Sequence, residues 1–569
     1  MDNPDRVTYF AATDNRGKRT PFGIKAKDRA RHMYVIGKTG MGKSTLLENM
    51  AIQDIVNGEG LAFIDPHGSA VEALLEYIPE HRLKDVVYFA PFDLDNPIAF
   101  NVMEDVGYDK RHLVVSGLMA TFKKIWVDAW SARMEYILSN TLLALLEYPE
   151  ATLLGVNRMY VDKEYRKKVV ENIKDPVVKD FWTKEFATYT DRYTQEATPA
   201  IQNKIGQFTS NPLIRNIIGQ PHSSFDVRTL MDQKKILLIN LSKGLVGDVN
   251  MKLLGSMLTT RIFLGAMSRA DLPATELKKA APFYFYVDEF QNFANETFAE
   301  ILSEARKYNL NLVMAHQYVE QMDEEVRAAV FGNVGTTVAF RIGAPDAEIM
   351  EVLFAPEFTK EDLVNLGFAQ IYLTLMIDGV GSRPFSGVTI PPIQAPAKTF
   401  KQEVIAASRT VFAGRRNDVE GAIYAELASI PAPEAPPPRV DWKSMKKNKG
   451  ANGNGNSNGN VPRPYNGNGE VRSGNGQPPP QKKFVPPQPL ERPTPPDRDS
   501  LKAALAEMTE KIAKANENKH IQQEASLKEV VATVAPPPVR EKPMAPASKT
   551  EQVFEVPEAE LRAVLTDND

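Results

Sequence analysis

Short apolar runs without polar alternation recur through the first 430 residues. Each run has the length of a β-strand, and unbroken apolarity is typical of strands covered on both faces. Helical spacing follows several runs, as at Lys43–Val56 and Met251–Ser268. This order predicts an α/β fold with a mostly parallel sheet and helices on both faces. The predicted strands are Met33–Ile36, Leu61–Ile64, Val86–Phe89, Ile236–Ile239, Phe283–Val287, Leu310–Met314 and Thr336–Phe340.

The pattern changes between Tyr108 and Ser224, where strand-like runs become rare. Helical spacing dominates there, at His112–Leu146, Lys163–Val170 and Ala200–Phe208. We therefore predict an all-α insertion between strands of the sheet.

Pro and Gly are concentrated after Ile430. Residues 431–500 hold 16 Pro and 8 Gly, and such a segment cannot bury enough apolar surface to offset its chain entropy. It is predicted to be a disordered linker. Farther on, Leu501, Leu505, Met508 and Ile512 have helical spacing, which predicts either a transient amphipathic helix or a docking helix for a partner.

These changes of pattern divide the chain into six predicted segments. The ranges are 1–107 and 225–430 for the two parts of the α/β domain, 108–224 for the helical insertion, 431–500 for the linker, 501–530 for the amphipathic helix and 531–569 for a disordered tail.

Composition excludes several classes of protein. The 569 residues include no Cys, which rules out disulfides, thiol catalysis and cysteine-ligated zinc or iron–sulfur centres, and suits a reducing cytosol. The net charge is -4, from 68 Lys and Arg against 72 Asp and Glu, so nucleic acid would be bound through a local basic surface. No run of about 18 uncharged apolar residues is present, and we expect a cytoplasmic protein without a membrane span.

A phosphate-binding loop follows the first predicted strand. Gly37–Ser44 fits the pattern G-x-x-x-x-G-K-[ST] at every fixed position and leads into a predicted helix. Glycines let backbone N–H groups approach phosphate oxygens, Lys43 reaches the β and γ phosphates, and Ser44 supplies a hydroxyl to Mg²⁺. The predicted nucleotide-binding residues are Gly37, Lys38, Thr39, Gly40, Met41, Gly42, Lys43, Ser44 and Thr45.

Two carboxylates end the strand Phe283–Val287. Asp288 is predicted to hold Mg²⁺ together with Ser44, and Glu289 to orient and deprotonate the attacking water. Gln317, after the next strand, is predicted either to contact the γ-phosphate or the water, or to make an ordinary loop hydrogen bond. His67 shares the same sheet edge and is interpreted as a turn residue.

Five motifs in this order resemble the HerA/FtsK superfamily of ring-forming, DNA-pumping ATPases, most of all its TraG/TraD-type coupling ATPases and HerA-like helicases. The resemblance extends over about Thr20 to Ile430. The motifs are Met33–Thr45, Phe63–Gly68, Ile239–Gly244, Val287–Gln291 and Glu304–Gln317.

The resemblance implies binding of ATP and Mg²⁺, a homo-oligomeric ring of six subunits, and an insertion that contacts DNA or another substrate at the ring entrance. It implies that Asp288 and Glu289 form the Walker B pair and that Gln317 is the sensor glutamine. It also points to Arg306 as the arginine finger that reaches a neighbouring subunit's site. Arg341, after the strand Thr336–Phe340, is the competing candidate.

The function that follows from these features is ATP-driven translocation of DNA, in conjugation or a transfer process like type IV secretion. Three alternatives stay open: a HerA-like helicase in DNA processing, a pump for protein or protein–DNA substrates, and a nucleotide-gated scaffold. The tail is predicted to recruit a protein partner, which would also bring the motor to the membrane.

Overall fold

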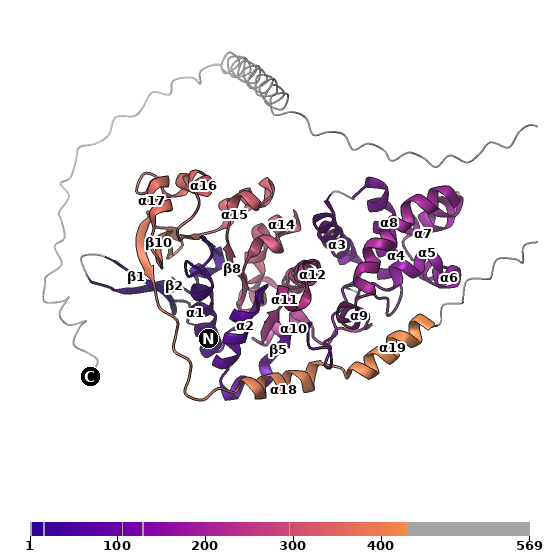
Figure 1. Cartoon of the computed structure of the whole chain (residues 1–569), viewed down its shortest axis with the longest axis horizontal. Coiled ribbons are helices and arrows are strands. Elements are labelled where there is room, and N and C mark those ends of the chain that lie inside the picture. Colours follow the sequence, from indigo (N-terminus) through magenta and orange to yellow (C-terminus); the bar gives the residue numbers. More distant parts are fainter. Residues whose placement is uncertain are drawn as a thin grey trace, which may run out of the picture. The chain divides into compact units, whose positions relative to one another are not determined.

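An 11-stranded sheet organises the part of the chain that the structure describes (Figure 1). The structure is a computed structural model, and it describes residues 3–428 apart from 15–17, 105, 128–129, 190 and 295. The strand order is β2-β1-β13-β10-β9-β3-β8-β7-β4-β6-β5. The predicted linker, amphipathic helix and tail lie outside the described residues.

Seven neighbouring strands are parallel, and each corresponds to a predicted strand. They are β3 (Met33–Ile36), β4 (Gly60–Asp65), β5 (Val86–Phe89), β6 (Ile236–Asn240), β7 (Phe283–Val287), β8 (Leu310–His316) and β9 (Thr336–Ala339). Every residue in these strands is buried, which explains why their sequences lack polar alternation. The predicted mostly parallel sheet is confirmed.

Antiparallel strands extend one side of the sheet beyond β9, and the sequence pattern did not predict them. Their residues alternate between buried and exposed positions or are only half-buried, so no continuous apolar run marks them. They are β1 (Val7–Ala12), β2 (Pro21–Lys25), β10 (Gln370–Thr374) and β13 (Phe385–Thr389), and β11 (Met376–Ile377) pairs with β12 (Val380–Gly381) in a separate hairpin.

Alternate residues of the parallel strands enter two different cores, one on each face of the sheet. In β3, Met33 and Val35 pack with helices α1, α2 and α18, while Tyr34 and Ile36 pack with the core that includes α12, α14 and α15. The predicted covering of both faces is therefore confirmed. These helices are α1 (Lys43–Val56), α2 (Ser69–Leu74), α12 (Asp248–Met267), α14 (Glu296–Glu304), α15 (Glu324–Asn333) and α18 (Lys401–Phe412).

Helices fill the chain between β5 and β6, and its described residues contain no strand. At the start of several of these helices, an Asp, Asn or Ser side chain accepts a hydrogen bond from a backbone N–H group, as at Ser131, Asp162 and Asn211. This hydrogen bond stabilises the helix N-terminus. The helices are α3 (Arg111–Ile125), α4 (Ala132–Leu146), α5 (Gly155–Val161), α6 (Lys163–Asn172), α7 (Pro176–Asp180), α8 (Asp191–Thr209), α9 (Pro212–Ile218) and α10 (Val227–Asp232).

The remaining helices lie in loops of the sheet or near the end of the described chain. Among the residues that the structure describes, no helix has the length and apolarity to span a bilayer. The remaining helices are α11 (Lys243–Val246), α13 (Ala274–Leu277), α16 (Ala344–Phe354), α17 (Lys360–Asn365) and α19 (Arg416–Ala428).

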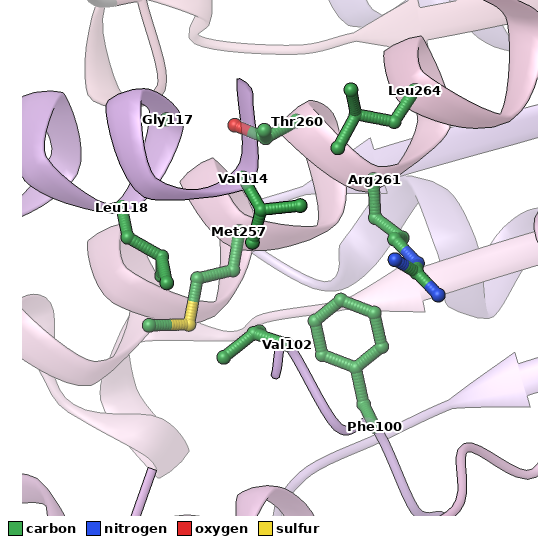
Figure 2. A pocket seen from close by; sticks show the side chains of 9 residues that line it. All are labelled: Phe100, Val102, Val114, Gly117, Leu118, Met257, Thr260, Arg261 and Leu264. Atoms are coloured by element: carbon green, nitrogen blue, oxygen red, sulfur yellow. The ribbon is translucent and has the colours of Figure 1, made fainter. Parts of the chain in front are cut away.

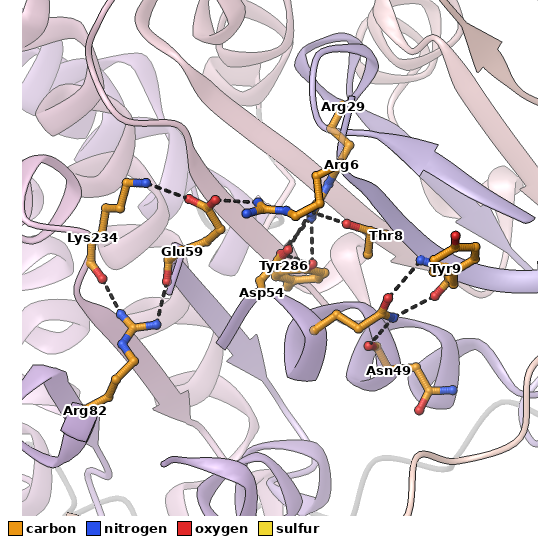
Figure 3. Close-up of polar contacts among 11 residues, drawn as sticks. Arg6, Thr8, Tyr9, Arg29, Asn49, Asp54, Glu59, Arg82, Lys234 and Tyr286 are labelled. Carbon is orange, nitrogen blue, oxygen red and sulfur yellow. Dashed lines mark hydrogen bonds and ion pairs between the residues drawn. The ribbon is translucent and has the colours of Figure 1, made fainter. Parts of the chain in front are cut away.

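A buried ion pair joins the last turn of α1 to strand β7 (Figure 3). The two terminal nitrogens of Arg29 donate to the two carboxylate oxygens of Asp54, at 2.7 and 2.8 Å. Arg29 and Asp54 also hydrogen-bond the Tyr286 hydroxyl, and the guanidinium lies 3.5 Å from the centroid of the Tyr284 ring. Because these partners compensate two buried charges, loss of one charge leaves the other unpaired.

Helix α3 packs closely against α12 through Gly117. A Cβ atom on Gly117 would lie 2.5 Å from Cγ2 of Thr260, which is closer than packed carbon atoms approach. Next to this contact, a cavity of about 20 Å³ lies between the two helices and the segment that carries Phe100 and Val102 (Figure 2). The absence of a side chain at Gly117 therefore allows α3 to lie close to α12.

Replacement of Asp54 by Ala should lower the free energy of unfolding by about 3 to 5 kcal/mol, because Arg29 would stay buried without its counter-ion. Urea unfolding monitored by circular dichroism measures the loss. Glu348→Ala is the control, since the Glu348 carboxylate pairs with Lys360 at the surface and water screens that interaction. Equal unfolding midpoints for the two variants would contradict the role given to the buried pair.

Replacement of Gly117 by Ala should destabilise the fold by about 1 to 3 kcal/mol, because the new methyl group would overlap the Thr260 side chain. Adding Thr260→Ser should recover much of the loss, since serine lacks Cγ2. Gly421→Ala is the matched control: Gly421 lies in α19 with open space around it, so Ala there should stabilise the helix slightly. Destabilisation of both glycine variants to the same extent would argue against the close contact.

Candidate nucleotide-binding site

The phosphate-binding loop lies between β3 and α1, with strands β8 and β9 on either side of β3. The Gly37 N–H donates to the His316 carbonyl at 3.2 Å, and the Lys38 N–H donates to the Arg341 carbonyl at 2.8 Å. Gly40 and Gly42 have φ angles of 77° and 112°, which other L-residues rarely adopt. The glycines of the motif are therefore required by the backbone path of the loop.

Lys43 places its ammonium group inside this loop. Its Nζ donates to the Gly37 carbonyl at 2.7 Å and to the Lys38 carbonyl at 3.3 Å. Burial lowers the pKa of Lys43, while the carboxylates of Glu289 and Asp288 act in the opposite direction. A cation held by loop carbonyls at a helix N-terminus provides the charge that phosphate oxygens need.

Ser44 and Asp288 come together although 244 residues separate them in sequence. The Ser44 hydroxyl donates to Oδ2 of Asp288 at 2.8 Å. Burial raises the pKa of Asp288 to about 6, and the hydrogen bond from Ser44 acts in the opposite direction. A hydroxyl and a carboxylate oxygen are hard ligands, and Mg²⁺ in nucleotide sites binds one or two such groups together with phosphate oxygens. These two residues therefore fit Mg²⁺.

Glu289 follows Asp288 in a left-handed backbone conformation with φ of 47°. Its carboxylate accepts a hydrogen bond from Nε2 of Gln291 and lies 3.9 Å from Nε2 of His67. The His67 side chain is 63% exposed, compared with 12% for Glu289. The predicted catalytic carboxylate is thus positioned by its own loop, and His67 lies on the solvent side of it.

Gln317 lies at the same sheet edge, directly after β8. Its Nε2 donates to the Tyr318 hydroxyl at 2.7 Å. The preceding residue, His316, is buried and hydrogen-bonds the Tyr34 hydroxyl through Nδ1 at 2.9 Å. Burial lowers the pKa of His316 to about 3, with Lys124 and Lys43 acting in the same direction. A neutral, fixed histidine holds the end of β8 next to the phosphate-binding loop.

The structure separates the two arginine candidates. Arg341 follows β9 and belongs to the same sheet edge as the loop, because its carbonyl accepts the Lys38 N–H. Arg306 is exposed and lies in the turn Ala305–Tyr308, before β8 begins. Because strands rise about 3.3 Å per residue, the seven residues of β8 place Arg306 roughly 20 Å from that edge. Arg306 is too far to contact the phosphate-binding loop of its own chain.

Sequence reasoning assigned no role to two carboxylates near the loop, those of Glu48 and Asp65. Glu48 lies one helical turn after Ser44, and burial together with Asp65 and Asp288 raises its pKa to about 7. Asp65 accepts the N–H groups of His67 and Ala70 and so shapes the turn after β4. Helical spacing from Ser44 could have revealed Glu48.

One protein-family model matches part of the chain. Residues 282–353 match the family described as the TraM recognition site of TraD and TraG. The match begins at β7, includes the Asp288–Glu289 pair, and ends in α16. The resemblance to TraG/TraD-type ATPases is therefore confirmed over this segment. No curated protein matches the chain in sequence.

Solved structures that match the chain include the conjugative coupling protein TrwB and VirB4. The unbound conjugative coupling protein TrwBdeltaN70 is 13% identical, with a TM-score of 0.47, over 69% of this chain and 91% of that chain. TrwB in complex with ADP and Mg²⁺ gives 13% identity and a TM-score of 0.48 over 70% and 98%. VirB4 of Thermoanaerobacter pseudethanolicus gives 14% identity and a TM-score of 0.45 over 70% and 99%.

Proposed function

We propose that this chain is a Mg²⁺-dependent ATPase that drives DNA through a homo-oligomeric ring during conjugation or type IV secretion. The observation that carries the ATPase assignment is the hydrogen bond of 2.8 Å between Ser44 and Asp288, because it joins the phosphate-binding loop to the acidic strand end. The family match at residues 282–353 supports the assignment to DNA transfer.

Each residue has one role in the proposed reaction. Lys43 binds the β and γ phosphates, and Ser44 and Asp288 hold Mg²⁺, which neutralises charge on the transferring phosphoryl group. Glu289 orients the attacking water and accepts its proton. Gln317 contacts the γ-phosphate or the water. Since hydrolysis by in-line displacement needs little covalent chemistry from the protein, positioning accounts for most of the catalysis.

The position of Arg306 supports the proposal of a ring. Its position at the opposite end of β8 suits a guanidinium that reaches the active site of the adjacent subunit, where it stabilises charge on the phosphoryl group. Six copies that contact head to tail would form a closed ring with one active site at each interface. Arg341 then acts within its own subunit.

A protein partner also belongs to the proposal. The family model that matches residues 282–353 is described as a recognition site for TraM in TraD and TraG. By analogy, this segment and the tail after residue 428 recruit a protein bound to the DNA substrate, and a cytoplasmic motor would reach the membrane through such a partner.

Purified protein should hydrolyse ATP in the presence of Mg²⁺, and DNA should raise the rate. Lys43→Ala should lose ATP binding, and Glu289→Gln should bind ATP but hydrolyse it about 100-fold or more slowly, because a general base is removed. Steady-state phosphate release and equilibrium nucleotide binding measure these effects. Lys84→Ala, which changes an exposed lysine, is the control. Normal turnover in Glu289→Gln would refute the site assignment, and a rate that ignores DNA would refute the substrate assignment.

Mixed rings test the arginine finger. Arg306→Ala and Glu289→Gln should each be inactive, yet an equal mixture should recover about a quarter of wild-type turnover, because random assembly places an intact site beside an intact arginine at that fraction of interfaces. A mixture of Arg341→Ala with Glu289→Gln should stay inactive, since both changes act in the same subunit. Recovery in the second mixture and not in the first would transfer the finger to Arg341.

A further inference from the structure

The helical insertion reaches the catalytic loop through a lysine. Lys124 is the second-last residue of α3, and its Nζ donates to the Gln291 carbonyl at 2.9 Å and to the Ala294 carbonyl. Both carbonyls belong to the loop that follows Asp288 and Glu289. A single ammonium group from the insertion therefore holds the backbone of the loop that carries the proposed general base.

This ammonium group lies in a costly environment. Burial lowers the pKa of Lys124 to about 8, with Asp323 raising it and Lys252 lowering it. Lysine is rarely withdrawn from water unless its charge is compensated, and the hydrogen bonds described for Lys124 are to loop carbonyls. Because burying the ammonium group is costly, we infer that this contact does more than keep α3 soluble.

Further hydrogen bonds connect this loop to the proposed catalytic carboxylate of Glu289. Nε2 of Gln291 donates to Oε2 of Glu289, and the Asn292 side chain donates to the Glu289 carbonyl at 3.1 Å. The left-handed backbone of Glu289 costs on the order of 1 to 3 kcal/mol for a residue that is not glycine, so it persists only when its surroundings hold it. The loop segment 289–294 is therefore held at both Glu289 and Gln291.

Helix α3 has a close contact on one side and a cleft on another. Gly117 packs against Thr260 of α12, two turns before Lys124. A cleft of about 630 Å³ is lined by residues of α3, α4, α14 and α15, with Glu300 and Glu325 among them. A shift of the insertion across this cleft would move Lys124 relative to the catalytic loop.

We propose that Lys124 is a positioning residue for ATP hydrolysis, which transmits the position of the helical insertion to Glu289 through the loop 289–294. This inference rests on the proposed ATPase function. In a motor whose insertion contacts the substrate, the link would make turnover depend on where the insertion lies. In this proposal Lys124 acts through Gln291 and Glu289, since its described hydrogen bonds are to carbonyls of the loop.

Lys124→Met tests the link, because methionine keeps the apolar stem and removes the ammonium group. It should lower kcat about tenfold to a hundredfold, as small displacements of catalytic groups do, and leave the KM for ATP and nucleotide binding unchanged, because the phosphate-binding loop is untouched. Lys124→Arg should restore much of the rate. Lys167→Met, at an exposed lysine of α6 in the same insertion, should behave as wild type.

A double variant separates positioning from general stability. Adding Gln291→Ala to Lys124→Met should cost little further rate, because both changes interrupt one path to Glu289. Unchanged kcat in Lys124→Met, or a raised KM at normal kcat, would overturn the proposal. If Lys124→Met does not fold, Gln291→Ala alone decides, and unchanged kcat there overturns it. A wild-type protein without Mg²⁺-dependent ATPase activity would refute the proposed function instead.

Discussion

The site depends on the position of helix α1 relative to strand β7. Contacts at both ends of the helix hold it in that position. At its first turn Ser44 donates to Asp288, and at its last turn Asp54 binds Arg29 and the Tyr286 hydroxyl. The helix is thus attached to β7 and to the residue that follows it at two points, one at each end of α1. A misplacement of about 1 Å can lower the rate a hundredfold. A buried ion pair far from the phosphate site therefore helps to hold Lys43 and Asp288 in place. It does so although burying its two charges is itself unfavourable.

Sequence reasoning succeeded for the part of the sheet where burial is symmetrical. The seven parallel strands are apolar on both faces, so each appears as an unbroken run, and Lys43, Ser44, Asp288 and Glu289 stand in motifs whose spacing the loop and strand ends require. It failed at β1, β2, β10 and β13, whose half-buried residues pair with distant segments. It also missed Lys124, because that lysine binds backbone carbonyls, and carbonyls have no residue type that a sequence could reveal.

The topology also bears on the proposed division of roles, in which one arginine acts within a subunit and the other between subunits. All seven parallel strands end at one edge, which brings together the residues that follow β3, β4, β7, β8 and β9. Arg341 is one of them. Arg306 precedes β8 and so belongs to the opposite edge, from which it can serve only the site of another copy in the proposed ring. A site divided in this way would be incomplete in a monomer and would link hydrolysis to assembly.

The end of the described chain bears on how the insertion is held. Lys401 of α18 pairs with Glu72 near the sheet, whereas in α19 Glu420 accepts from Asn216 and Glu426 pairs with Arg158, both on the insertion. One continuous segment thus contacts the sheet-covering layer and the insertion in succession. Asn216 and Arg158 are buried, whereas the carboxylates of Glu420 and Glu426 are partly exposed, so water weakens each contact. A restraint of this kind, together with the half-buried Lys124 at the loop 289–294, suits an insertion whose small displacements matter to the proposed hydrolysis.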